Sequence, residues 1–131
     1  MRLNTFFSAV FLLIFFFLVL NCNSNQQQAP TNQMDGVVAI DRFNKEIAAI
    51  NNPQLIDVRT PKEFGAGHID GAININYNGS NFEQSIGQLD KAQPVFIYCH
   101  SGGRSGKAYK KMKAMGFSTV YDLKGGYSGL K

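Results

Sequence analysis

Short apolar runs alternate with amphipathic segments from residue 37 to residue 123, and this alternation constrains the fold more than any other feature of the sequence. Each run has the length and composition of a buried strand. Strands that alternate with helices form a parallel sheet with helices on both faces. We therefore predict an α/β fold with a five-stranded, mostly parallel sheet. The predicted strands are residues 37–40, 55–58, 72–75, 94–98 and 119–123.

Local signals place helices between these runs. Apolar residues spaced i, i+4 and i+7 predict a first helix, for which Asp41 can serve as the cap. Residues 60–63 and 80–83 both match the capping box, in which the first and last side chains of the segment each bind the other's backbone N–H. The last predicted helix covers residues 105–115 and stops at Gly116.

A glycine-rich loop follows the fourth and most apolar predicted strand, in the sequence CHSGGR at residues 99–104. Ligands of parallel sheets bind beyond the carboxyl ends of the strands, which is where Cys99 falls. A helix that begins after such a loop presents free N–H groups, and Gly102 and Gly103 allow these groups to converge on an anion. We expect this loop, with the charge of Arg104, to lower the pKa of Cys99 and to activate its thiol as a nucleophile.

Each of these residues also has a plain structural interpretation. Cys99 could be a buried and inert core cysteine, although the polar and glycine residues after it favour the catalytic interpretation. A catalytic thiol must also be reachable from solvent. His100 is either a general base or an exposed loop residue. The lysines of the last predicted helix either steer anions or form its solvated face; they are Lys107, Lys110, Lys111 and Lys113.

The N-terminal segment differs from the rest of the chain. Residues 6–20 form a run of 15 residues that is apolar except for one serine, which suits a signal peptide better than the roughly 20 residues of a membrane span. We interpret residues 1–21 as a signal peptide. Cys22 resembles the cysteine of a bacterial lipobox, which becomes lipidated; an uncleaved anchor helix is the alternative. Residues 22–35 would then be a lipidated cysteine and an Asn/Gln-rich tether to a domain at 36–131.

This interpretation places the domain outside the cytoplasm, on the periplasmic side or the cell surface, as a membrane-tethered bacterial lipoprotein. The formal net charge of +4 falls to about +3 without Arg2, too little to predict a nucleic-acid partner. After Cys22 the only cysteine is Cys99, so no disulfide framework is possible within the domain of one chain. An unpaired Cys99 in an exported protein is a liability unless its thiol has a function.

Two segments resemble the signatures of the single-domain rhodaneses, a family of sulfurtransferases. The sequence LIDVRTPKEFGAGHIDGAINI at 55–75 resembles the first signature. The sequences YCHSGGRSGKAYKKMKAMGF at 98–117 and VYDLKGGYSG at 120–129 match the active-site loop, its helix and the final glycine pair. The resemblance implies a rhodanese-like fold and an enzyme without cofactor or metal. Cys99 would take a sulfane sulfur from a small anion such as thiosulfate, hold it as a persulfide and pass it to cyanide or a thiol.

The resemblance also implies roles for other residues. The loop amides would cradle the transferred sulfur; the loop residues are His100, Ser101, Gly102, Gly103 and Arg104. Four more match family positions that brace the loop; they are Asp57, Arg59, Glu63 and His68. One alternative is a phosphatase or arsenate reductase on the same fold, but those enzymes place five residues between cysteine and arginine where this chain has four. The other is a non-catalytic sulfur-carrier or binding module.

Overall fold

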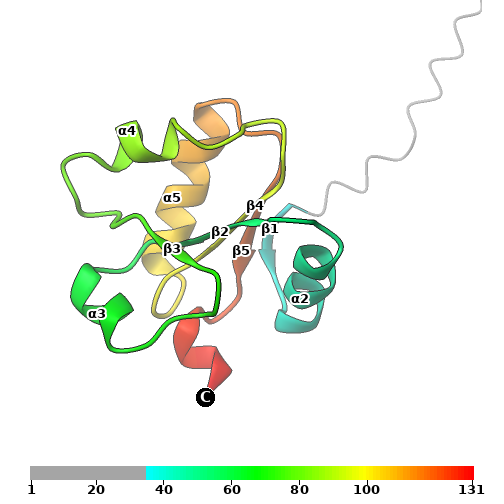
Figure 1. Ribbon diagram of the computed structural model, residues 1–131, viewed down its shortest axis with the longest axis vertical. Helices are drawn as coiled ribbons and strands as arrows, with labels where there is room; N and C mark the ends of the chain where they lie inside the picture. The colour runs from blue at the N-terminus through cyan, green and yellow to red at the C-terminus, as the bar shows by residue number, and fades with distance from the viewer. Residues whose placement is uncertain (1–34) are drawn as a thin grey trace, which may run out of the picture. The chain divides into compact units, whose positions relative to one another are not determined.

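The computed structural model describes residues 35–131, so the predicted signal peptide, the predicted lipidation site at Cys22 and nearly all of the tether lie outside the described residues. Within this range five strands form one sheet in the order β1-β5-β4-β2-β3, and each neighbouring pair is parallel (Figure 1). This arrangement confirms the predicted parallel α/β fold. The strands are β1 Gly36–Val38, β2 Gln54–Asp57, β3 Ile73–Asn74, β4 Val95–Tyr98 and β5 Val120–Leu123.

Helices cover both faces of the sheet. Helix α2 packs on one face, and α4 and α5 pack on the other (Figure 1). No helix within residues 35–131 combines the length and the apolar character that a bilayer span requires. The helices are α2 Ile40–Ala48, α3 Pro61–Gly65, α4 Phe82–Ile86 and α5 Gly103–Ala114, followed by the 3-10 helix η1 Tyr127–Leu130.

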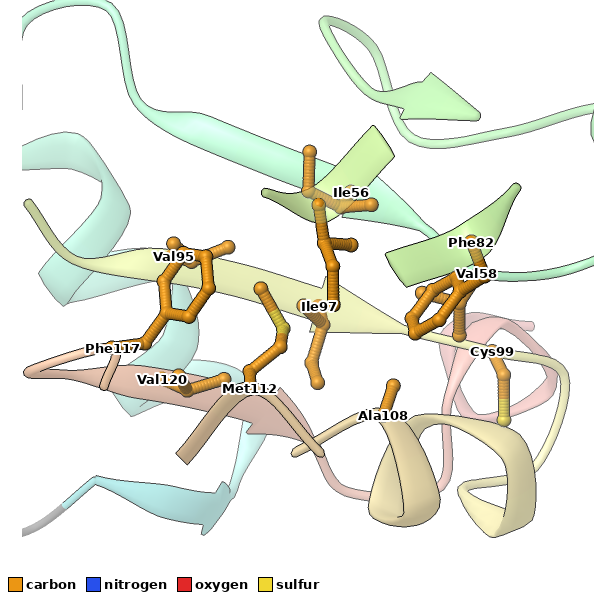
Figure 2. Close-up of a cluster of buried hydrophobic side chains, with 11 residues drawn as sticks. Ile56, Val58, Phe82, Val95, Ile97, Cys99, Ala108, Met112, Phe117 and Val120 are labelled. Atoms are coloured by element: carbon orange, nitrogen blue, oxygen red, sulfur yellow. The ribbon is translucent and has the colours of Figure 1, made fainter. Parts of the chain in front are cut away.

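The central strand β4 is buried on both faces, as expected for a strand in the middle of a parallel sheet. Val95 and Ile97 pack into the cluster beneath α4 and α5, which Figure 2 shows. Phe96 and Tyr98 pack into the cluster beneath α2. Because β4 is packed on both faces, it holds the next residue, Cys99, in a defined place at the carboxyl end of the strand.

Two predicted helix caps are wrong in detail. Ala39, not Asp41, is the N-cap of α2, and no side chain caps this helix. Asp41 lies in the first turn instead, where its charge still favours the helix N-terminus. Helix α4 begins after Asn81 and lacks the capping box predicted for residues 80–83. Its first N–H, that of Phe82, donates to the Gly79 carbonyl in a backbone turn.

Helix α5 begins two residues before the predicted start at Ser105. Gly102 is its N-cap, with a φ of 104°. Arg104 and Ser105 therefore belong to the first turn of the helix rather than to a free loop. The helix fixes the direction of both side chains, and this decides which groups surround the thiol.

Candidate active site

The Cys99 sulfur lies at the carboxyl end of β4, beside the loop 100–102 that leads into α5 (Figure 2). Its Sγ accepts a hydrogen bond from the Gly102 N–H at 3.1 Å and another from the Ser105 hydroxyl at 3.5 Å. The left-handed conformation of Gly102 is one that glycine adopts without steric strain. It allows the backbone N–H to turn inward, so that the loop forms a concave site for a negatively charged atom.

The hydrogen bonds of the loop decide the ionisation of Cys99. Burial alone raises the pKa of the thiol, but hydrogen bonds from the Ser105 hydroxyl and from the N–H groups of Ser105, Gly102 and Ser101 outweigh burial. The pKa of Cys99 therefore lies below its ordinary value. Since the thiolate is the nucleophilic form, this geometry supports the activation expected from the sequence.

The Cys99 side chain is nevertheless enclosed. Cys99 is only 1% exposed, so the structure does not show the solvent-reachable thiol that a catalytic role requires. Its neighbours in the core, among them Val58 and Ala108, lie on the side of the sheet covered by α5 (Figure 2). His100 and Ser101 are exposed, so the loop is the part of the enclosure that faces solvent.

Arg104 points to a partner outside the loop. Its guanidinium donates two hydrogen bonds to the Glu63 carboxylate, at 2.6 and 2.7 Å. The same carboxylate accepts bonds from the N–H and hydroxyl of Thr60, which completes the predicted capping box of α3. Glu63 thus joins the first signature segment to the start of α5. Its negative charge also balances the positive charge of Arg104, which the sequence analysis expected to act on Cys99.

Glu63→Gln is expected to destabilise the protein by about 1 kcal/mol near neutral pH, because glutamine keeps the capping box but removes the charge that binds Arg104. The Arg104 hydrogen bonds hold the pKa of Glu63 well below its usual range, against the effect of burial. A carboxylate with a lowered pKa in the folded state stabilises the protein above its unfolded pKa, about 4.3, and this contribution is lost as the pH falls further.

Denaturant unfolding of both proteins at about pH 7 and about pH 3 measures this difference. The difference in unfolding free energy between the wild type and Glu63→Gln should be smaller at about pH 3 than at about pH 7. An equal gap at both pH values would show that the ion pair with Arg104 adds no stability.

Asp57 and Arg59 form a buried ion pair at the end of β2. Asp57 is 0% exposed and Arg59 is 3% exposed, and the shortest of their hydrogen bonds, from Arg59 Nη2 to Asp57 Oδ2, is 2.6 Å. The same Arg59 nitrogen donates to the Gly67 carbonyl at 2.7 Å. The guanidinium also lies 4.2 Å from the centre of the Tyr127 ring. Arg59 therefore ties together three segments around the loop.

The C-terminal segment holds the backbone of the loop from the other side. The Tyr127 N–H donates to the Cys99 carbonyl at 2.8 Å, and the Ser128 N–H donates to the His100 carbonyl at 2.9 Å. Gly126 makes this approach possible, since a Cβ at that position would lie 2.4 Å from the Cys99 carbonyl oxygen. Gly126 thus allows the C-terminal segment to position Cys99 through the main chain.

The two histidines have different outcomes. His68 was expected to brace the loop, but its ring stacks on Phe64 and its Nδ1 lies 3.0 Å from the Phe64 carbonyl. Within the described part of the chain His68 makes no hydrogen bond to the loop, so it steadies the end of α3 instead. His100 is exposed, and no hydrogen bond from its side chain is seen among residues 35–131.

Two lysines of α5 form ion pairs, Lys111 with Glu83 and Lys113 with Asp35. These pairs favour a solvated helix face over the steering of anions.

Three residues at the site were not identified from the sequence: Ser105, Gly126 and Tyr127. Ser105 was predicted only as the first residue of the last helix. Its position directly after Arg104 places it in the first turn, where its hydroxyl faces the thiol. Gly126 was recognised only as part of a glycine pair. The contact of Tyr127 with Arg59 joins residues that are distant in the chain, so no local pattern indicates it.

Comparison with known proteins agrees with this geometry. A family model for the rhodanese-like domain matches residues 40–131. The Bacillus subtilis protein YqhL is 41% identical over 80 residues, which is 61% of this chain and 62% of that protein. The thiosulfate sulfurtransferase GlpE of Shewanella oneidensis is 40% identical over 75 residues, 57% of this chain and 72% of that enzyme.

A solved structure shows the same fold. The rhodanese-related protein from Thermoplasma volcanium matches with a TM-score of 0.62 and 25% identity, over 71% of this chain and 87% of that one. The chain therefore belongs to the rhodanese-like family, and the named sulfurtransferases among its relatives support rhodanese-type sulfur transfer at the level of that family.

Proposed function

We propose that this protein is a sulfurtransferase that moves a sulfane sulfur from a small anion such as thiosulfate to a thiol or cyanide, through a persulfide on Cys99. The observation that carries the proposal is the unpaired Cys99 thiol, whose pKa is lowered by inward-facing hydrogen-bond donors at the end of β4. The similarity to a named thiosulfate sulfurtransferase supports it independently.

The proposed reaction has two steps. The Cys99 thiolate attacks the outer sulfur of thiosulfate; a new S–S bond forms, the S–S bond of thiosulfate breaks, and sulfite leaves with the electron pair. The acceptor anion then attacks the terminal sulfur of the persulfide, and the Cys99 thiolate leaves. Sulfur enters and leaves through one covalent intermediate, without an external oxidant or reductant. The N–H groups of Ser101 and Gly102 are suited to stabilise the charge on the terminal sulfur.

The protein is expected to form thiocyanate from thiosulfate and cyanide and to leave aryl phosphate and arsenate unchanged. Arg104 is bound to Glu63 rather than directed into the loop, which disfavours recognition of a tetrahedral oxyanion. Parallel assays for thiocyanate, released phosphate and reduced arsenate test the assignment. Phosphate release or arsenate reduction without thiocyanate would place the protein in the rival class. A Cys99 persulfide that no acceptor removes would indicate a sulfur carrier.

We also propose that the domain is held at a membrane outside the cytoplasm by lipid on Cys22. The support is the sequence alone: a signal-like apolar run followed by a lipobox-like cysteine and a polar tether. Cys22→Ala should remain unlipidated and be released from the membrane fraction or accumulate as an unprocessed precursor. A variant that sediments with membranes at the molecular mass of the wild-type protein would show that the leader is an ordinary uncleaved anchor.

A further inference from the structure

Asp122 on β5 is a buried carboxyl group that the proposed sulfur transfer does not use. It is 1% exposed, and its Oδ1 has no hydrogen-bond partner among the described residues. Burial raises the pKa of Asp122 to about 6, although the Ser105 hydroxyl opposes the rise. A buried carboxyl group with an oxygen that lacks a hydrogen-bond partner is costly to keep in a core.

Ser105 lies between this carboxyl group and the sulfur. Its side chain is fully buried in the first turn of α5. Asp122 Oδ2 lies against the same turn, 3.9 Å from the position that a Cβ on Gly106 would take. A hydrogen bond from Ser105 lowers the pKa of Asp122. The Ser105 hydroxyl oxygen also lies 3.5 Å from Cys99 Sγ and 3.3 Å from the Gly102 carbonyl oxygen. A hydroxyl group has one proton to donate, so these acceptors compete for it.

The strands on either side of Asp122 add no charge to this competition. Its sheet neighbours in register, on β1 and β4, are the apolar residues Val37 and Ile97. The titratable groups on the elements packed against this face include Cys99 beyond β4 and, on α5, Arg104, Tyr109 and Lys113. Arg104 binds Glu63 and also interacts electrostatically with Cys99. Helix α5 also carries Lys107, Lys110 and Lys111. Lys113 binds the Asp35 carboxylate before β1, together with the Ser118 carbonyl, and Tyr109 lies beside Gly36 of β1.

We propose that Asp122 is a positioning residue for the Cys99 nucleophile and acts through Ser105: a proton on the Asp122 carboxyl group turns the Ser105 hydroxyl toward the sulfur and stabilises the thiolate. Protonated Asp122 donates to Ser105 Oγ, which leaves the Ser105 proton for Cys99. Ionised Asp122 accepts that proton instead, and the sulfur loses a donor. The transfer starts from ionised Asp122 and the neutral Cys99 thiol: the Cys99 proton passes to Ser105 Oγ as the Ser105 proton passes to Asp122. Asp122 and Cys99 together therefore carry one negative charge before and after the transfer.

The role of Asp122 in turnover rests on the proposed function, but its link to Cys99 can be measured without any sulfur donor. The ultraviolet absorbance of the thiolate is followed against pH in the full-length protein, with Cys99→Ser subtracted so that Cys22 cancels. Asp122→Asn, whose amide donates to Ser105 at every pH, should lower the thiolate midpoint by about one pH unit, a tenfold change. In a Ser105→Ala background the same substitution should shift the midpoint by less than about half as much.

Asp90→Asn is the matched control, because Asp90 is an exposed aspartate whose carboxylate accepts hydrogen bonds from Ala92 and Gln93. It should leave the midpoint unchanged. No shift in Asp122→Asn, or an equal shift with and without Ser105, overturns the proposal. If the Asp122 variant does not fold, carbon NMR titration of Asp122 replaces it: Ser105→Ala should raise that midpoint, and an unchanged midpoint overturns the link. Loss of sulfur loading with the link intact would refute only the proposed function.

Discussion

Cys99→Ser is expected to lower thiocyanate formation by about a thousandfold or more, because the serine hydroxyl cannot hold a sulfane sulfur and the two-step path through a persulfide is closed. Serine is close to cysteine in size and can accept the same hydrogen bonds from Gly102 and Ser105. The loss should therefore appear in turnover and not in stability. Thiocyanate assays under matched conditions, with unfolding curves of both proteins, measure the two effects separately.

Cys22→Ser is the matched control for this prediction. It removes the other cysteine of the chain, which lies in the proposed lipidation site and not in the sulfur-transfer site. We expect the detergent-solubilised control protein to keep its activity. Equal losses in the two variants, or full activity without Cys99, would contradict a persulfide on this residue.

Asp57→Ala is expected to destabilise the protein by about 3–5 kcal/mol, the usual range when one partner of a buried ion pair is removed. Arg59 is 3% exposed, so without Asp57 its charge would remain in the core with the Gly67 carbonyl as its main remaining hydrogen-bond partner. The damage should extend to the thiol, because Arg59 packs against Tyr127, whose N–H holds the Cys99 carbonyl. Denaturant unfolding gives the stability change, and the thiolate titration gives the effect on the site.

A double variant distinguishes lost charge pairing from lost packing. Replacing both partners, Asp57→Leu with Arg59→Met, removes the unpaired charge, and such replacements of buried pairs are often close to neutral in stability. The double variant should therefore be more stable than Asp57→Ala alone. If the loss of stability in the double variant equalled the sum of the losses from its two single replacements, the pair would not act as a unit. Arg59 would then contribute through its packing with Tyr127.

The parallel sheet and the thiol-bearing loop were predictable because their signals are local. Apolar runs separated by helical segments imply a parallel sheet, and a cysteine followed by two glycines at a strand end implies a loop of converging N–H groups. The order of the strands was not predictable from such patterns, since β1 lies at the edge beside β5, the last strand in the chain.

The groups that position the loop around the thiol were harder to predict because several of them come from distant segments. Arg104 was expected to act on Cys99 directly, yet its charge is balanced by Glu63, which lies 41 positions earlier in the chain. The enclosure of Cys99 also depends on how α5 and the C-terminal segment pack against β4. One error was local: the capping box predicted at residues 80–83 is absent, and a backbone turn, in which the Phe82 N–H donates to the Gly79 carbonyl, leads into α4.

The mass of the Cys99 peptide after brief treatment of the folded protein with thiosulfate tests the central claim most directly. The loop is expected to keep the sulfur ionised and to let a small donor reach it despite its burial. We predict a gain of one sulfur atom on Cys99, and a return to the original mass when cyanide is added. A Cys99 peptide that gains no sulfur, and whose thiol reacts with alkylating reagents only after denaturation, would contradict the account and identify Cys99 as a structural core cysteine.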